Sequence, residues 1–176
     1  MDVYEAINRR RSVRKYAETP VPEESLKRIL EAARVAPSAS NRQPWYFIVV
    51  TDSGKRKIIS QGRYAKFVTE SPIVIVGCAD KMASPKWCVV DVSIALENIV
   101  LAATGEGLGT CWIGGFIEED VKRILEIPEK YDVIAIISVG YPRENLDVDQ
   151  MPLEQAHARK SLQEIVGYEK YGQARA

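Results

Sequence analysis

The sequence predicts an α+β domain in which helices flank a central mixed β-sheet. The chain opens with helical periodicity, and strands and helices then follow in mixed order. An apolar, β-branched run at residues 73–78 is typical of a strand that is buried on both faces. The length of 176 residues is enough for a domain with its own core, so residues 1–176 are predicted to form a single domain.

Two helices are predicted before the first strand. The apolar side chains of residues 2–10 recur on one side of a short helix, at Val3, Ala6 and Ile7. A second helix begins at Pro22, which suits a first helical position, and ends before Pro37. A polar loop at residues 38–44 follows. The next predicted elements are a strand at 46–50, a helix at 54–61 and the buried strand at 73–78.

Residues 88–104 are apolar on nearly every side of a helix, and their number favours a helix over a strand. The polar side chains of this run are Asp91, Ser93, Glu97, Asn98 and Thr104. Such a helix must be covered on nearly every side. A partner subunit in a dimer and the core of a monomer would each supply that cover.

The remaining elements are predicted from shorter patterns. These are a strand at 108–113, a helix at 117–125 that ends before Pro128, and a strand at 133–139. The chain becomes polar after Tyr141 and Pro142. The C-terminal segment, residues 143–176, is predicted to contact a neighbouring subunit.

Composition excludes several classes of function. Lys and Arg number 24 and Asp and Glu number 24, so the neutral chain has no general field that attracts nucleic acid or an anionic membrane. The N-terminus lacks the apolar core of a signal peptide, and no apolar run reaches the roughly 20 residues that span a bilayer. The odd number of cysteines, in apolar surroundings, predicts reduced thiols and a cytoplasmic protein. With His157 as the single histidine, neither a His-rich metal site nor a Ser-His-Asp triad is expected, so a bound cofactor would carry any difficult chemistry.

The first candidate site is the arginine segment, residues 10–14. If the chain is extended here, Arg10, Ser12 and Arg14 project to one side, while Arg11 and Val13 face the other way. Guanidinium and hydroxyl donors in this arrangement suit a phosphate group. A solvated basic helix end would carry the same residues.

Two further segments are rich in groups that bind ligands. The polar loop between Pro37 and Trp45 presents short hydrogen-bonding side chains that suit a planar heterocycle, although an ordinary helix-to-strand connection has the same composition. The glycine-rich segment, residues 107–116, would let a ligand approach the backbone closely. A tight turn into the next helix explains its glycines equally well.

Taken together and in this order, the segments resemble the nitroreductase family of FMN enzymes. The matching motifs are Arg-Arg-Ser-Val-Arg at 10–14, Pro-Ser-x-x-Asn-x-Gln-Pro-Trp at 37–45, Gly-Leu-Gly-Thr-Cys-Trp-Ile-Gly-Gly at 107–115 and Arg-Lys-Ser-Leu at 159–162. The resemblance extends from about residue 2 to about residue 167. It implies a nitroreductase-like fold and an intertwined homodimer with two FMN sites at the interface, in which the 88–104 helix is the main dimer helix.

The resemblance also implies roles for individual residues. The residues that match ligands of the flavin phosphate and of the pyrimidine side of the ring are Arg10, Arg11, Ser12, Arg14 and Arg159. Those that match contacts to the ring from the other subunit are Pro37, Ser38, Ser40 and Asn41. Ile113, Gly114 and Gly115 match the backbone that faces flavin N5, with the Gly114 amide as donor. His157 and Lys160 lie next to the matched phosphate position.

The implied function is transfer of hydride from NAD(P)H, through flavin N5, to a small oxidised acceptor such as a nitroaromatic or a quinone. Hydride transfer requires no protein acid or base, which is compatible with a chain that has one histidine. Two alternatives remain open. One is a flavin carrier or redox sensor without fast turnover, and the other is a specialised branch that carries out reductive dehalogenation or flavin breakdown.

Overall fold

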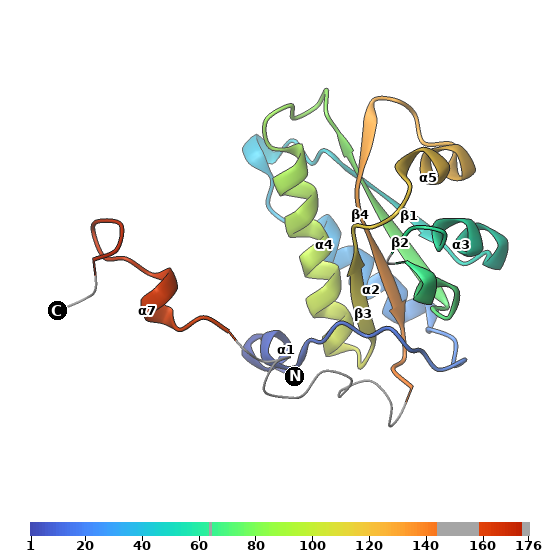
Figure 1. Ribbon diagram of the computed structural model, residues 1–176, viewed down its shortest axis with the longest axis horizontal. Helices are drawn as coiled ribbons and strands as arrows, with labels where there is room; N and C mark the ends of the chain where they lie inside the picture. Colours follow the sequence, from blue (N-terminus) through green and yellow to red (C-terminus); the bar gives the residue numbers. More distant parts are fainter. Residues whose placement is uncertain (64, 144–158, 174–176) are drawn as a thin grey trace.

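The computed structural model describes residues 1–63, 65–143 and 159–173. A four-stranded sheet lies at its centre, with helices on both faces (Figure 1). The strands lie in the order β1 (Trp45–Val50), β2 (Ile73–Asp80), β4 (Tyr131–Gly140) and β3 (Gly109–Ile113). Helices and sheet therefore form three layers, and the predicted α+β class is confirmed.

All neighbouring strands pair antiparallel, because β4 inserts between β2 and β3. β2 and β3 run in the same direction, and α4 (Cys88–Gly105) connects them. The prediction of a mixed sheet is therefore wrong for the four described strands, because β2 and β3 are not neighbours and form no parallel pair. In the part of the chain that the structure describes, parallel pairing occurs at one bridge, between Ser12 and Thr110.

The other helices follow the predicted order, except that the last one, in the C-terminal segment, was not predicted. They are α1 (Val3–Arg9), α2 (Glu23–Arg34), α3 (Ser53–Ile59), α5 (Glu118–Leu125) and α7 (Leu162–Ile165). Each predicted helix and strand is present, and its ends lie within a few residues of the prediction. Two short 3-10 helices, η1 (Ala39–Asn41) and η2 (Lys66–Thr69), were not predicted, because three or four residues carry no readable periodicity.

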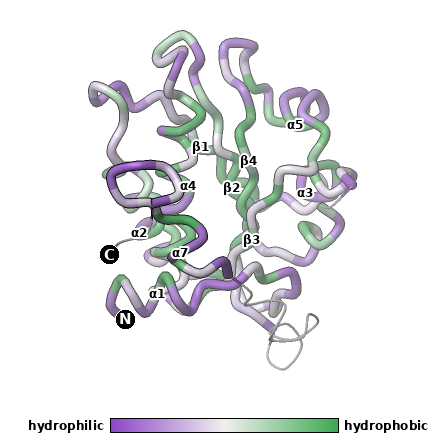
Figure 2. Tube along the Cα trace, turned by 60° about the vertical axis from the view of Figure 1, so that its left-hand side comes forward, coloured by the Kyte–Doolittle hydropathy of each residue, from purple (hydrophilic) through white to green (hydrophobic). Residues whose placement is uncertain are grey.

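Two apolar cores lie on opposite faces of the sheet. One joins α2 and α4 to one face, and the other joins α3 and α5 to the other face. Strand β2 contributes alternate residues to each core, so Ile75 packs towards α4 while Val74 and Val76 pack towards α3 and α5. The hydrophobic colouring of β2 and β4 in Figure 2 follows from this double burial.

Helix α4 packs on the sheet with one side and leaves the other side open. By length and composition alone it could cross a membrane, but Val92, Leu96 and Ile99 are fully buried in the core. Apolar side chains on its outer side remain exposed: Trp87 just before the helix is 45% exposed, Val90 46% and Ile94 38%. Their spacing places them on one stripe.

The N-terminal helix and the C-terminal segment also expose apolar residues. On α1 only Ala6 of the predicted stripe is buried, whereas Val3 is 60% exposed and Ile7 51%. Every residue from 159 to 173 is exposed, and this segment extends away from the rest of the described chain (Figure 1). Most of the predicted partner contact at 143–176, including His157, lies outside the described residues.

Candidate functional site

The arginine segment lies along the outer edge of β3. The amide of Val13 donates to the carbonyl of Thr110 at 2.8 Å, and the Val13 side chain is buried against Gly109. Because side chains alternate in an extended chain, burial of Val13 leaves Ser12 and Arg14 exposed on the opposite side. For Ser12, Val13 and Arg14 this is the alternation that the sequence predicted, whereas Arg11 is exposed and does not share the buried side of Val13.

Arg10 and Arg11 differ in their surroundings. Arg10 is half-buried at the end of α1, where its backbone is extended. The guanidinium of Arg11 donates to the carbonyls of Asn8 at 2.6 Å and Arg10 at 2.9 Å. It therefore satisfies the last carbonyls of α1, which favours a structural role alongside the predicted role in flavin binding.

Tyr16 attaches the arginine segment to the sheet. Its side chain is 1% exposed, and its hydroxyl donates to the Val13 carbonyl at 2.7 Å and lies 2.6 Å from the Ser138 hydroxyl on β4. These bonds tie the segment to the end of the sheet. Tyr16 thus holds in place the backbone that carries the candidate phosphate ligands.

Replacing Tyr16 by phenylalanine is expected to lower the free energy of unfolding by about 1–3 kcal/mol, because the Val13 carbonyl and the Ser138 hydroxyl lose a buried partner. Urea unfolding of the flavin-free protein measures this change. Tyr46→Phe is the control, since Tyr46 is 57% exposed and should change stability by less than about 0.5 kcal/mol. Equal stability of the two variants would contradict the anchoring role.

The glycine-rich segment continues from this edge. Ile113 ends β3 and is 3% exposed, whereas Gly114 is exposed and a Cβ added to it would meet no atom within 4 Å. The approach to the Gly114 backbone is therefore open, as a ligand there would require. Gly115, by contrast, packs closely against Gly62.

The thiol of Cys111 faces the arginine segment. Burial raises the pKa of Cys111, although Arg14, a hydrogen bond with Ser12 and Arg10 act in the opposite direction. Burial also raises the pKa of Cys78 to about 11. Both thiols stay neutral at pH 7, so they suit a packing role rather than nucleophilic chemistry. The three cysteines are free and buried, as predicted.

A segment that the sequence did not single out also reaches this site. Arg14 lies over the ring of Phe67, with its guanidinium carbon 6.0 Å from the ring centre. Gly62, a few residues earlier, contacts the backbone of Gly115. Gly62 therefore lies against the glycine-rich segment, and Phe67, next to Lys66, lies against the arginine segment. The small Gly62 within a basic stretch was the available signal.

The polar loop lies elsewhere in the same chain. The amide of Ala39 donates to Asp91 in the first turn of α4, whereas the arginine segment borders Thr110, beyond the last turn of that helix. About 21 Å of helix separates Asp91 from Gly105. Figure 1 shows the two segments at opposite ends of α4. Arg10 and the polar loop are thus not brought together within one subunit.

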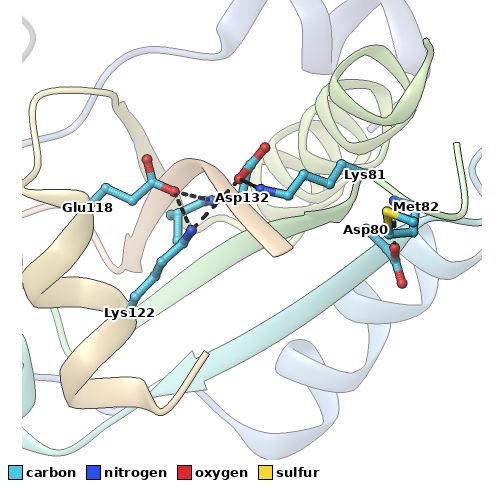
Figure 3. Close-up of polar contacts among 7 residues, drawn as sticks. Asp80, Lys81, Met82, Glu118, Lys122 and Asp132 are labelled. Atoms are coloured by element: carbon cyan, nitrogen blue, oxygen red, sulfur yellow. Dashed lines mark hydrogen bonds and ion pairs between the residues drawn. The ribbon is translucent and has the colours of Figure 1, made fainter. Parts of the chain in front are cut away.

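Ion pairs dominate the opposite end of the sheet. Lys122 on α5 pairs with Glu118 at 3.3 Å and with Asp132 at 3.7 Å, and Lys81 pairs with Asp132 at 2.8 Å (Figure 3). Glu118 also accepts a hydrogen bond from the amide of Val133. This network links α5 to β4, and its charged groups are paired with one another.

The cations of the candidate site have no such partners. Among the ion pairs of the described residues, none involves Arg10, Arg14 or Lys66, whereas Arg9, which precedes Arg10, pairs with Glu5 at 2.9 Å. Guanidinium groups without a carboxylate partner, at one edge of a neutral protein, are suited to attract an anion. Arg159 and Lys160 are exposed in the C-terminal segment, and the described contacts do not join them to this cluster.

Comparison with known proteins gives a consistent result. The model of the Nitroreductase family matches residues 7–83 and 59–141. A protein of Methanothermobacter thermautotrophicus, provisionally named NADH dehydrogenase/NAD(P)H nitroreductase, is 41% identical over 88% of this chain and 87% of its own. An FMN-dependent nitroreductase from Clostridium difficile superposes with a TM-score of 0.74 and is 34% identical, covering 90% of this chain and 99% of that one. A second Clostridium difficile structure, a nitroreductase family protein, gives a TM-score of 0.83 at 29% identity over 97% and 99% of the two chains.

Proposed function

Since the chain belongs to the nitroreductase family and is an FMN-dependent NAD(P)H oxidoreductase, we propose a class of electron acceptor for it. The proposed acceptor is a small oxidised molecule such as a nitroaromatic or a quinone. Bound FMN would supply the hydride chemistry, from the nicotinamide to the acceptor. The observation that carries the proposal is the unpaired cation cluster of Arg10 and Arg14 beside the open backbone of Gly114. We place this activity in the cytoplasm, which agrees with the free cysteines.

The residues of the site fit FMN. Arg10 and Ser12 would hold the phosphate, because guanidinium and hydroxyl groups are the donors that a phosphate dianion prefers. Arg14 would lie near the N1/O2 side of the ring and stabilise negative charge there. The Gly114 amide would donate at N5. Arg159 would add a second phosphate contact from the C-terminal segment.

We further propose that the working form is a homodimer. A single subunit separates the polar loop from the arginine segment by the length of α4, so both can border one flavin only if they come from different subunits. A two-fold axis beside α4 would place the loop of one subunit next to the arginines of the other. The exposed stripe of Trp87, Val90 and Ile94 offers the apolar surface for that contact.

Anaerobic mixing with NADH or NADPH tests the proposed reaction. The yellow absorbance of the FMN-loaded protein is expected to bleach within the turnover time and to return when a nitroaromatic or a quinone is added. A flavin that stays oxidised with both nucleotides, although dithionite reduces it, would contradict the proposed donor. A bleached flavin that no such acceptor reoxidises would contradict the proposed acceptor class.

Replacing Ile94 by lysine is expected to weaken dimerisation by roughly a hundredfold or more, because the charge enters the apolar stripe of both subunits. Sedimentation velocity over a range of concentrations measures the change, and FMN binding should fall together with dimerisation. Met82→Lys is the control, since Met82 is 75% exposed and belongs to the turn after β2 rather than to the stripe on α4. A dimer of unchanged affinity in Ile94→Lys would place the interface on another surface.

A further inference from the structure

The polar loop is held in an unfavourable backbone conformation. Ser40, Asn41 and Gln43 have φ values of 52°, 54° and 47°, in the left-handed region that residues other than glycine seldom adopt. Asparagine tolerates this region best, so Ser40 and Gln43 carry most of the strain. Strain of this kind persists only where the surroundings enforce it, and it gathers at binding sites.

Hydrogen bonds within the loop stabilise its turn but do not attach it to the rest of the subunit. The amide of Gln43 donates to the Ser38 hydroxyl at 2.9 Å, and the amide of Asn41 donates to the Ser38 carbonyl at 3.0 Å. The side chains of Ser40, Asn41 and Arg42 stay exposed. These bonds, with that of the Gln43 side chain to the Asn41 side-chain oxygen at 3.2 Å, lie within the loop, so the outward-facing Ser40 remains available to a group outside this subunit.

Asp91 fixes the loop to the helix. Asp91 is 3% exposed, and its carboxylate accepts the hydrogen bond of the Ala39 amide at 3.0 Å and lies 3.5 Å from the hydroxyl of the fully buried Ser84. The first turn of a helix favours a negative charge, so α4 itself supports the carboxylate. Burial of a carboxylate is costly, and the bonds to Ala39 and Ser84 offset that cost only while the loop stays against the helix.

We propose that Asp91 is a positioning residue for the flavin site: its buried carboxylate holds the polar loop in the strained form that presents Ser40 and Asn41 to the flavin of the partner subunit. This inference rests on the proposed function and adds to it a residue that contacts neither flavin nor substrate. Asp91 acts through the Ala39 amide, at the point where the left-handed residues begin. It also sits on the helix that we assign to the dimer interface, so one helix sets both the subunit contact and the loop.

The experiment compares Asp91→Ala, Asp91→Ser and Asp91→Asn with the control Asp52→Asn. Asp52 accepts the Lys55 amide at 2.8 Å at the start of α3, so its variant also loses a charged acceptor of a backbone amide, but away from the loop. Asparagine at 91 can still accept the Ala39 hydrogen bond, whereas alanine cannot, and serine is too short to reach it. FMN affinity and the visible circular dichroism of bound flavin are measured at a temperature where every variant is folded.

Asp91→Ala, or Asp91→Ser if the alanine variant does not fold, is expected to bind FMN about tenfold more weakly and to change the circular dichroism of the bound flavin. Asp91→Asn is expected to restore most of both signals, and Asp52→Asn to leave both unchanged. Wild-type affinity and spectrum in Asp91→Ala would overturn the proposal. So would an Asp91→Asn variant as weak as Asp91→Ala.

Hydrogen exchange of residues 38–43 in the absence of FMN separates this inference from the proposed function. Exchange is expected to be faster in Asp91→Ala than in the wild type, because the loop is released from α4. Unchanged exchange would overturn the role of Asp91 even if FMN binds. Faster exchange in Asp91→Ala than in the wild type, together with a wild-type protein that binds no FMN, would support the hold on the loop and contradict the flavin site.

Discussion

Alanine at Gly62 is expected to lower the free energy of unfolding by about 1–3 kcal/mol and to impair flavin binding at the same time. The added Cβ would lie 2.1 Å from the Gly115 carbonyl oxygen, 2.7 Å from the Phe116 Cα and 2.9 Å from the Gly115 carbonyl carbon. All three atoms belong to the backbone, so no side chain can rotate away to relieve the overlap. The backbone at Gly115 and Phe116 must therefore shift, and this backbone belongs to the segment that we propose to face flavin N5.

Two glycine variants serve as controls for Gly62→Ala. Neither Gly105 nor Gly114 has an atom within 4 Å of an added Cβ. Gly105→Ala, at the end of α4, should keep stability or raise it by up to about 1 kcal/mol, without effect on flavin. Gly114→Ala should keep the stability of the flavin-free protein but weaken FMN binding, because its methyl group enters the space that the ring would fill.

Urea unfolding and FMN titration distinguish the three variants. A Gly62→Ala protein with wild-type stability would mean that residues 62 and 115 do not pack as closely as described. A destabilised Gly62→Ala protein with unchanged FMN affinity would separate the Gly62 contact from the flavin site. Only the combined loss supports a site in which Gly62 lies against the glycine-rich segment.

Much of the fold is predictable because the apolar patterns are long. The wholly apolar run of β2 and the eighteen residues of α4 each allow one interpretation of secondary structure, and the structure agrees with both. The pairing of strands is different. β4 lies between β2 and β3, and this order depends on how the strands pack together against α4. No local sequence pattern carries this information.

The candidate site divides in the same way. Local motifs identified Arg10, Ser12, Arg14 and the glycines after β3, and the structure places Ser12, Arg10 and Arg14 near Cys111 on that strand. Contacts between distant segments were not visible in the sequence. Gly62 against Gly115 and Asp91 holding Ala39 each join two elements that only the folded chain brings together.

Strain is also invisible to composition. Ser40 and Gln43 are residues that a sequence pattern assigns to an ordinary connection, and nothing in their type announces a positive φ. Propensity fails here because tertiary contacts override it. Such conflicts between local preference and fold concentrate at functional sites. The backbone conformation of this loop therefore indicates a functional role that its sequence alone does not.

Removal of the Arg10 guanidinium is expected to cost the most affinity for FMN. Arg10→Ala should weaken binding by about 1.5–3 kcal/mol, which is roughly ten- to 150-fold in the dissociation constant, because a charge-assisted contact to the phosphate is lost. Arg10→Lys keeps the charge but not the fork of donors, so it should recover only part of the affinity. Quenching of flavin fluorescence during titration measures each constant.

Arg9 supplies a matched control one residue away. Its guanidinium already pairs with Glu5 on α1, so Arg9→Ala should leave FMN affinity unchanged and cost stability by at most about 0.5 kcal/mol. If Arg9→Ala and Arg10→Ala weaken binding equally, the effect is the general positive field of the helix end rather than a phosphate contact. If neither weakens it, the anion site lies elsewhere. A loss of FMN affinity that is confined to Arg10→Ala requires a direct contact between FMN and the Arg10 guanidinium. This result would distinguish a phosphate site from a solvated basic helix end.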